Sequence, residues 1–157
     1  MGSTEVLLLA FLIGVIAGLR SLTAPAAVAW AGYGRGILTH TPLRFMGTLA
    51  AAIIFTVLAV AELITDKLPS TPSRLKTPGI TARIFTGALS GACLAAAGAE
   101  SIALGIALGV VGGVVGAFAG YYARKGLVQA LKVKDLPIAL LEDAVAIGGA
   151  IFIVTRF

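Results

Sequence analysis

Four acidic residues lie in the most apolar parts of this sequence. Glu62 and Asp66 follow the uncharged run FMGTLAAAIIFTVLAV (45–60), and Glu142 and Asp143 lie within an apolar segment at 136–154. Residues four apart share a helix face, so Glu62 and Asp66 are expected to point the same way. Carboxylates in apolar surroundings bind protons or cations, line a polar cavity, or pair with basic side chains. The sequence therefore predicts an acidic site whose role is open.

Basic residues near the acids offer a purely structural alternative. Arg74, Arg83, Arg124 and Lys125 flank the same segments and can pair with the four carboxylates, which would fix the connecting loops. Arg20 interrupts the first apolar run, where backbone carbonyls at a helix break can hold its guanidinium. In this interpretation the charges stabilise the fold, whereas in the other they line a polar pathway.

Residues typical of catalysis are scarce. His40 is the single histidine and lies beside Thr41 and Pro42 in an expected loop. The chain has no Cys/His metal spacing, nucleophile elbow or phosphate-binding loop. Glu62 and Asp66 could bind Mg²⁺ beside a lipid phosphate clamped by Arg74, but the pattern is unspecific. We therefore expect no enzyme, no cofactor and no metal.

The composition indicates the environment of these residues. Of 157 residues, 59% are hydrophobic and 12% are charged, with a mean hydropathy of +1.03. Soluble domains carry about 25% charged residues. The chain is therefore expected to be one integral membrane domain over 1–157, with the lipid bilayer as its partner. The net charge of +5 comes without a basic patch interleaved with aromatics, so nucleic-acid binding is not expected.

An all-α, polytopic helical bundle is the predicted fold. A spanning helix needs about 20 apolar residues, and about five segments approach that length. The first is a broken helix, with a run at 6–19, Arg20 and a short helix at 24–31; the others are 43–66, 80–98, 102–122 and 136–154. Four spans plus a re-entrant segment is the alternative. The prolines of 67–79 exclude a regular helix there, and 123–134 is expected to form a separate amphipathic helix along the membrane interface.

Five crossings would place the N-terminus on the same side as the 67–83 and 123–135 loops. An excess of Lys and Arg marks the cytoplasmic side, so this side, and with it the N-terminus, is predicted to be cytoplasmic. All four acids would then lie near the cytoplasmic side and Arg20 toward the outside. The eight basic residues expected on the cytoplasmic side are Lys67, Arg74, Lys76, Arg83, Arg124, Lys125, Lys132 and Lys134; those expected outside are Arg20, Arg35, Arg44 and Arg156.

Glycines at four-residue spacing predict close helix packing. Such glycines share a helix face and let two backbones approach closely within lipid. The pattern favours packing within the chain, with a homodimer face or a narrow pore wall as alternatives. The glycines concerned include Gly87, Gly91, Gly109, Gly113, Gly116 and Gly120. A weak match between 13–26 and 115–128 suggests an inverted repeat, a feature of transporters. A competing weak match between DKLP (66–69) and KDLP (134–137) suggests parallel repeats instead.

Three stretches together carry a family resemblance. They are GLRSLTAPAAVAWA (18–31), AELITDKLPSTPSR (61–74) with RIFTGALSGA (83–92), and LLEDAVAIGGA (140–150). The chain resembles bacterial members of the membrane family called domain of unknown function 4126 over almost its whole length. The resemblance implies a small multi-pass protein of the bacterial inner (cytoplasmic) membrane, and it implies no established activity, substrate or cofactor.

These observations favour a small transporter or channel-like protein, in the form of a possible homo-oligomer. A small ion or polar solute would pass a pathway lined by Glu62, Asp66, Glu142, Asp143 and Arg20. The alternative is a non-catalytic membrane scaffold or accessory protein whose charges are structural, and a lipid-phosphate enzyme is the third reading. A water-filled cavity at Glu62 would favour transport, whereas a dry and fully paired Glu62 would favour the scaffold.

Overall fold

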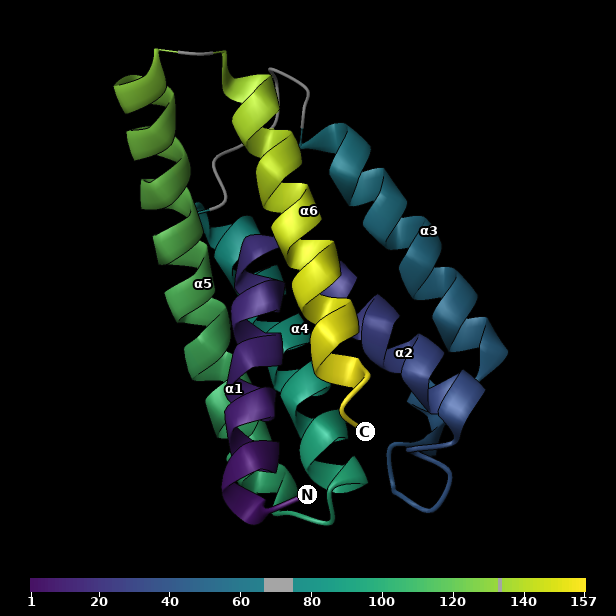
Figure 1. The fold of residues 1–157 in the computed structure, drawn as a ribbon. Coiled ribbons are helices and arrows are strands. Elements are labelled where there is room, and N and C mark those ends of the chain that lie inside the picture. Colours follow the sequence, from purple (N-terminus) through teal and green to yellow (C-terminus); the bar gives the residue numbers. More distant parts are fainter. Residues whose placement is uncertain (67–74, 133) are drawn as a thin grey trace.

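The computed structural model describes residues 1–66, 75–132 and 134–157, which form six α-helices and one 3₁₀ turn (Figure 1). The described residues contain no strand, which confirms the all-α prediction. Three helices, α4, α5 and α6, are long and apolar enough to cross a membrane, and α1 and α3 are shorter apolar helices. The elements are α1 (Ser3–Leu19), α2 (Thr23–Arg35), η1 (Arg44–Gly47), α3 (Leu49–Thr65), α4 (Thr77–Ala97), α5 (Ile102–Leu131) and α6 (Asp135–Val154).

Helix ends follow local chemistry. The Thr48 hydroxyl accepts a hydrogen bond from the Ala51 N–H and caps α3, and Gly36 ends α2 in the left-handed conformation with φ +68°. Helix α4 begins three residues earlier than expected because Pro78 lies in its first turn, where a missing N–H costs nothing. From the sequence alone, Pro78 was expected to belong to the non-helical stretch 67–79.

Helix α5 is longer than the sequence suggested. The expected interfacial helix at 123–134 does not exist as a separate element, because α5 continues without a break from Ile102 to Leu131. The prediction of a helix lying along the interface is wrong. Nothing in the sequence of this stretch stops a helix except Gly126, and one glycine costs only about 1 kcal/mol.

Glycines fix the packing of α1, α4 and α5. A Cβ on Gly87 would lie 2.5 Å from the Gly109 carbonyl oxygen, and one on Gly18 would lie 2.6 Å from the Gly116 Cα. A Cβ on Gly113 would lie 2.8 Å from the Arg83 carbonyl oxygen. The six predicted packing glycines are all buried. Packing within the chain is therefore confirmed, and the residues that α1 and α4 cover on α5 are not available to a second copy.

The same contacts give the helix directions. Gly14 lies against Gly109 and Gly18 against Gly113, so α1 and α5 run parallel, which contradicts the inverted repeat. Gly98 lies against the Val6 side chain, so the N-terminus sits beside the turn between α4 and α5.

Helix α2 reverses the direction of α1. Its C-terminal residue Arg35 donates hydrogen bonds to the carbonyls of Val154 and Thr155 at the end of α6. Both termini therefore lie at one end of the molecule, here called the terminal end (Figure 1). The opposite end, called the polar end, holds the C-terminal ends of α3 and α5 and the N-terminal ends of α4 and α6.

This arrangement corrects the expected topology. The N-terminus does not share a side with the α3–α4 and α5–α6 connections, because α1 and α2 form a hairpin that enters from the terminal end and returns to it. The chain path is a hairpin of α1 and α2 followed by the four helices α3 to α6. The expectation that the first helix and its short continuation run in one direction is wrong, so the N-terminus lies at the end opposite these two connections.

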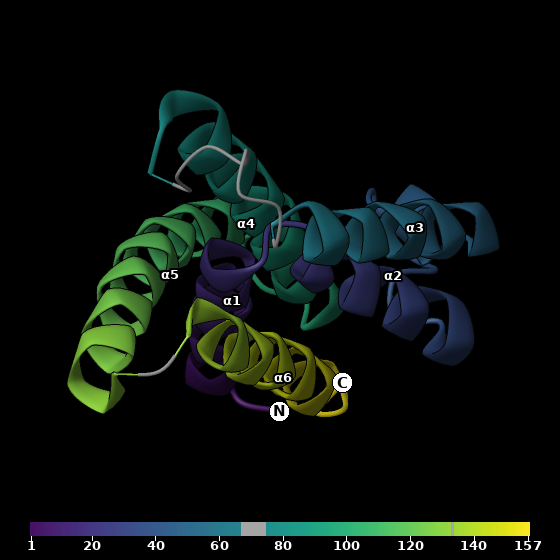
Figure 2. The ribbon, with the colours of Figure 1, turned by 90° about the horizontal axis from the view of Figure 1, so that it is seen from above.

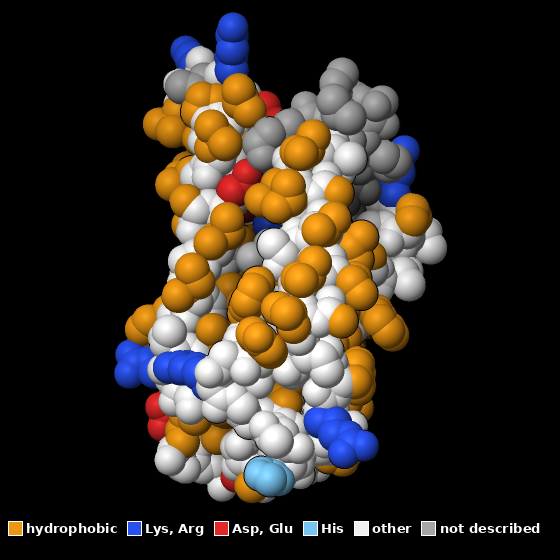
Figure 3. Space-filling model, turned by 90° about the vertical axis from the view of Figure 1, so that its right-hand side faces the viewer, with side chains coloured by type: hydrophobic (Ala, Val, Ile, Leu, Met, Phe, Trp, Pro, Cys, Tyr) orange, Lys and Arg blue, Asp and Glu red, His pale blue; other side chains and the backbone are white. Residues whose placement is uncertain are grey.

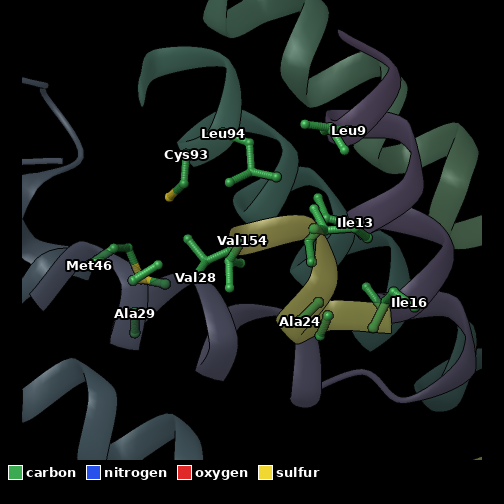
Figure 4. Close-up of a cluster of buried hydrophobic side chains, with 14 of the residues drawn as sticks. Leu9, Ile13, Ile16, Ala24, Val28, Ala29, Met46, Cys93, Leu94 and Val154 are labelled. Atoms are coloured by element: carbon green, nitrogen blue, oxygen red, sulfur yellow. The ribbon is translucent and has the colours of Figure 1, made fainter. Parts of the chain in front are cut away.

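The hydrophobic core lies around the hairpin. Side chains of α1, α2, α4 and α6 meet there, with Val28 and Val154 close together and Met46 of η1 at the edge (Figure 4). Helix α3 contributes Ala52 to this core and packs mainly on α2 (Figure 2). On the face in Figure 3, hydrophobic side chains cover much of the middle, and Lys and Arg side chains lie mostly toward the two ends, as expected for a membrane protein.

Candidate functional site

The break between α1 and α2 carries Arg20 into the interior of the protein. Helix α1 ends at Leu19, and Arg20 has an extended backbone with φ −139° and ψ 108°. The Arg20 side chain is 0% exposed, and it is among the largest fully buried side chains of the described residues. A guanidinium cannot lose its charge in a protein. The fold must therefore supply negative charge at this point.

Carboxylates from two helices meet the Arg20 guanidinium. Its Nη1 contacts Asp66, at the end of α3, and its Nη2 lies 2.6 Å from Oδ1 of Asp143 and 4.0 Å from Glu142, both on α6. The Arg20 Nε makes no hydrogen bond with the described residues. The expectation that backbone carbonyls hold Arg20 is wrong, because the acids lie on the same side of the break.

Glu62 caps the start of α2 from outside that helix. Its Oε1 accepts hydrogen bonds from the Ser21 N–H at 2.9 Å and the Ser21 hydroxyl at 2.7 Å, and its Oε2 accepts one from the Leu22 N–H at 2.8 Å. No side chain of α2 itself caps this end. A helix N-terminus exposes unpaired N–H groups and a partial positive charge, so a carboxylate here is stabilising.

Arg83 of α4 joins the same cluster from the other side. It donates from Nε to the Gly18 carbonyl at 3.0 Å and from Nη1 to the Gly79 carbonyl at 3.0 Å, and its Nη2 lies 3.8 Å from Glu62. The Gly18 carbonyl belongs to the last turn of α1, where the helix leaves its carbonyls unpaired. Arg83 therefore links α4, the end of α1 and α3.

Arg124 extends the cluster to the long helix α5. Its Nε donates to Asp135 at 2.8 Å, and its Nη1 lies 3.5 Å from Glu142. Glu142 thus lies between Arg124 and Arg20. Because Asp135 is 61% exposed, its pair with Arg124 is weaker than the buried contacts.

The result is a charge network that links α1, α3, α4, α5 and α6. Three guanidiniums face four carboxylates, and the side chains of Glu62, Glu142 and Asp143 are 9–10% exposed. Asp143 lies eight residues beyond the start of α6, about 12 Å along the helix at 1.5 Å per residue. The network consists of Arg20, Arg83, Arg124, Glu62, Asp66, Glu142 and Asp143.

The structure brings together nearly all the residues that the sequence singled out. The four acids share one site with Arg83 and Arg124, and Glu62 and Asp66 point the same way as expected. Arg20 joins them instead of lying on the opposite side. Arg74 lies outside the described residues. Ser21 was missed, because its N–H and hydroxyl donate to Glu62, 41 residues away, and no local sequence signal indicates that contact.

The contacts of Glu62 and Asp66 are relevant to whether these carboxylates could bind a metal ion. Among residues 1–66, 75–132 and 134–157, no three His, Cys, Asp or Glu side chains are placed to hold a metal ion. Both Glu62 oxygens receive N–H or O–H donors, and Asp66 faces a guanidinium. This part of the site is built to pair carboxylates with donors, which differs from the oxygen-only shell that Mg²⁺ needs.

Comparisons with protein-family models, with curated proteins and with solved structures find no match to this chain. The resemblance to the domain of unknown function 4126 family therefore stays a prediction. The function has to be argued from the geometry of the network and its place in the fold.

Proposed function

We propose that the protein is a small membrane transporter or channel-like protein in which the charge network closes a pathway for a small ion or polar solute. The observation that carries the proposal is Arg20, a fully buried arginine at the apex of a re-entrant hairpin, held by carboxylates of two other helices. Broken helices whose ends meet charged groups are a recurrent feature of transporter sites.

The energetic cost of the network supports a role beyond stability. Each buried charge loses several kcal/mol of hydration, and well-packed apolar residues in place of a buried ion pair are often at least as stable. A bundle that needed only to hold together would gain little from three arginines and four acids. Ionisable residues inside a membrane typically mark ion or solute pathways.

The distribution of basic residues supports one orientation of the molecule in the inner membrane as part of this proposal. The polar end carries the exposed Lys76, Lys125, Lys132 and Lys134, whereas the terminal end carries Arg35, Arg44 and Arg156. Lysine and arginine concentrate on the cytoplasmic side. The proposed orientation has the polar end in the cytoplasm and both termini on the other side, in place of the cytoplasmic N-terminus expected from the sequence.

Helix α3 is the element whose movement would open the pathway. It packs mainly on α2 and buries only Ala52 and Ala59. Its C-terminal end is held to the rest of the protein through Glu62 and Asp66. Displacement of these carboxylates by an anionic group of a solute would free the end of α3 from Arg20 and Ser21.

The test is a flux assay on purified protein in liposomes, with a panel of ions and imposed pH gradients. Glu62→Gln keeps the shape of the side chain but removes the charge, and its amide presents N–H groups to the donors of Ser21 and Leu22. We expect a leak about tenfold above that of the wild type, since hydrogen bonds to charged groups contribute about 1.5–3 kcal/mol each.

Glu5→Gln is the matched control, because Glu5 is exposed in the first turn of α1 at the terminal end. It should leave the flux unchanged. If neither the wild type nor Glu62→Gln carried flux under any gradient, the transport proposal would be abandoned.

A membrane scaffold is the second candidate, and the full engagement of Glu62 favours it. Both oxygens of Glu62 are paired, so the network can serve simply to connect five helices. In that case Glu62→Gln lowers the melting temperature and produces no leak. No feature of the described residues favours the lipid-phosphate enzyme, and a homo-oligomer stays a prediction that the covered glycine faces do not support.

A further inference from the structure

A cavity at the terminal end lies far from the charge network. It has a volume of about 380 Å³, within the usual range of small-ligand sites. It forms where the end of α2 meets η1, since Gly32 and Gly47 pack so closely that a Cβ on Gly32 would lie 2.7 Å from the Gly47 Cα. Its lining residues are Gly32, Thr39, Arg44, Phe45, Gly47 and Thr48.

Arg44 is the charged group in this cavity. Its side chain is exposed, and its guanidinium forms no hydrogen bond or ion pair with the described residues. The neighbouring Arg35 differs, because it is engaged by the carbonyls of Val154 and Thr155. The segment 32–48 also contains His40 and no acidic residue. An anion is the ligand that this charge pattern fits.

The surroundings of the cavity are those of a membrane interface. Trp30 and Tyr33 are about half exposed and pack edge to face with ring centroids 6.2 Å apart. Phe45 is 55% exposed at the cavity itself. Tryptophan and tyrosine concentrate at the level of lipid headgroups. The cavity therefore opens where phosphate groups of lipids are abundant.

An apolar surface continues from the cavity toward the middle of the bilayer. Leu49 follows the lining residue Thr48 directly, and Ile53 is four residues further along the same face of α3. Both side chains are more than 40% exposed. A molecule with an anionic head and an apolar chain can contact both the cavity and the adjoining apolar face of α3. A free anion would contact the cavity alone.

We propose that the cavity binds the phosphate headgroup of an anionic phospholipid, with the Arg44 guanidinium on the phosphate and an acyl chain along Leu49 and Ile53. Arginine suits this role because its planar fork donates two parallel hydrogen bonds to phosphate oxygens. The site is independent of the charge network and of the proposed transport.

The test is titration of the detergent-purified protein with short-chain phosphatidylglycerol, with bound lipid counted by native mass spectrometry. The wild type should bind the lipid more tightly than phosphatidylcholine, and Arg44→Gln should weaken phosphatidylglycerol binding by about tenfold, the scale of one lost charge-assisted contact. Arg44→Lys, which keeps the charge but not the fork, should fall between the two.

Arg156→Gln is the control, since Arg156 is an exposed arginine at the same end and lies over the Phe152 ring. It should bind as the wild type does. Equal binding of phosphatidylglycerol by Arg44→Gln and the wild type, with unchanged melting temperatures, would overturn the proposal. Saturation of the site by inorganic phosphate alone, at the concentration that suffices for the lipid, would overturn the assignment to a lipid in favour of a free oxyanion.

Discussion

Helices α5 and α3 are both apolar, yet they are joined to the protein by opposite means. Helix α5 presents a row of glycines to the backbones of α1 and α4, and the fit depends on the absence of side chains. Helix α3 buries only Ala52 and Ala59, packs mainly on α2, and is bound to the rest of the protein by two carboxylates at one end. Close backbone packing therefore holds α5 in place, whereas ion pairs and hydrogen bonds of carboxylates hold the end of α3. A change in bulk should damage α5, whereas a change in charge should damage α3.

The largest effect is expected from added bulk in α5. Gly109→Val would place a branched side chain against the Gly87 carbonyl and the neighbouring backbone, which cannot move aside. We expect a loss of at least about 4 kcal/mol in the free energy of unfolding, typical of severe clashes in a core. Thermal unfolding in detergent micelles, followed by circular dichroism, measures it.

Gly126→Ala in the same helix is the matched control. Nothing lies within 4 Å of a Cβ at Gly126, so alanine should raise the stability by about 0.5–1 kcal/mol through its helix propensity. Equal tolerance of both substitutions would show that glycine contact does not hold α5.

A large effect is also expected from loss of the charge that anchors α3. Arg20→Met leaves Asp66 and Asp143 without their buried partner. Removal of one side of a buried ion pair costs about 3–5 kcal/mol. Hydrogen exchange should show α3 losing protection first, while α1, α4 and α5 keep theirs.

Arg156→Met removes an arginine that pairs with no carboxylate among the described residues, and it should leave the exchange of α3 unchanged. Uniform loss of protection over all helices in Arg20→Met would contradict a separate anchoring of α3.

The smallest effect is expected midway along α3. The Trp30 indole donates a hydrogen bond of 2.8 Å to the Thr56 hydroxyl, an exposed link between α2 and α3. Trp30→Phe should lower the free energy of unfolding by about 0.5–1.5 kcal/mol, the usual value of one hydrogen bond. Tyr33→Phe serves as the control in the same thermal measurement. A larger effect than that of Arg20→Met would place the main attachment of α3 at its middle.

The sequence was sufficient for the parts of the fold that depend on local pattern. The apolar runs predicted the helices, and the glycine spacing predicted the close contacts of α5. The similar depth of the four acids predicted that Glu62, Asp66, Glu142 and Asp143 lie together. These properties follow from helix periodicity and the length of each run. The pairing with Arg83 and Arg124 followed from the need of buried acids for basic partners.

The reversal at Arg20 could not be read in the same way. The runs on either side of it add up to one membrane crossing, and no local signal shows whether the chain goes on or turns back. The turn is stabilised by Glu62 and Asp66, which are 40 to 46 residues away and bind Ser21, Leu22 and Arg20. The separate interfacial helix was a similar error, because an amphipathic sequence is equally compatible with a continued helix.

The buried position of Arg20 has a consequence for biosynthesis. Arg20 is made early, but its partners Asp66 and Asp143 lie on α3 and on the last helix, α6. A nascent chain that ends before α6 would hold an arginine whose second carboxylate does not yet exist, and such a charge is costly within a bilayer. We therefore expect the α1–α2 hairpin to reach its final place only after α6 has been synthesised.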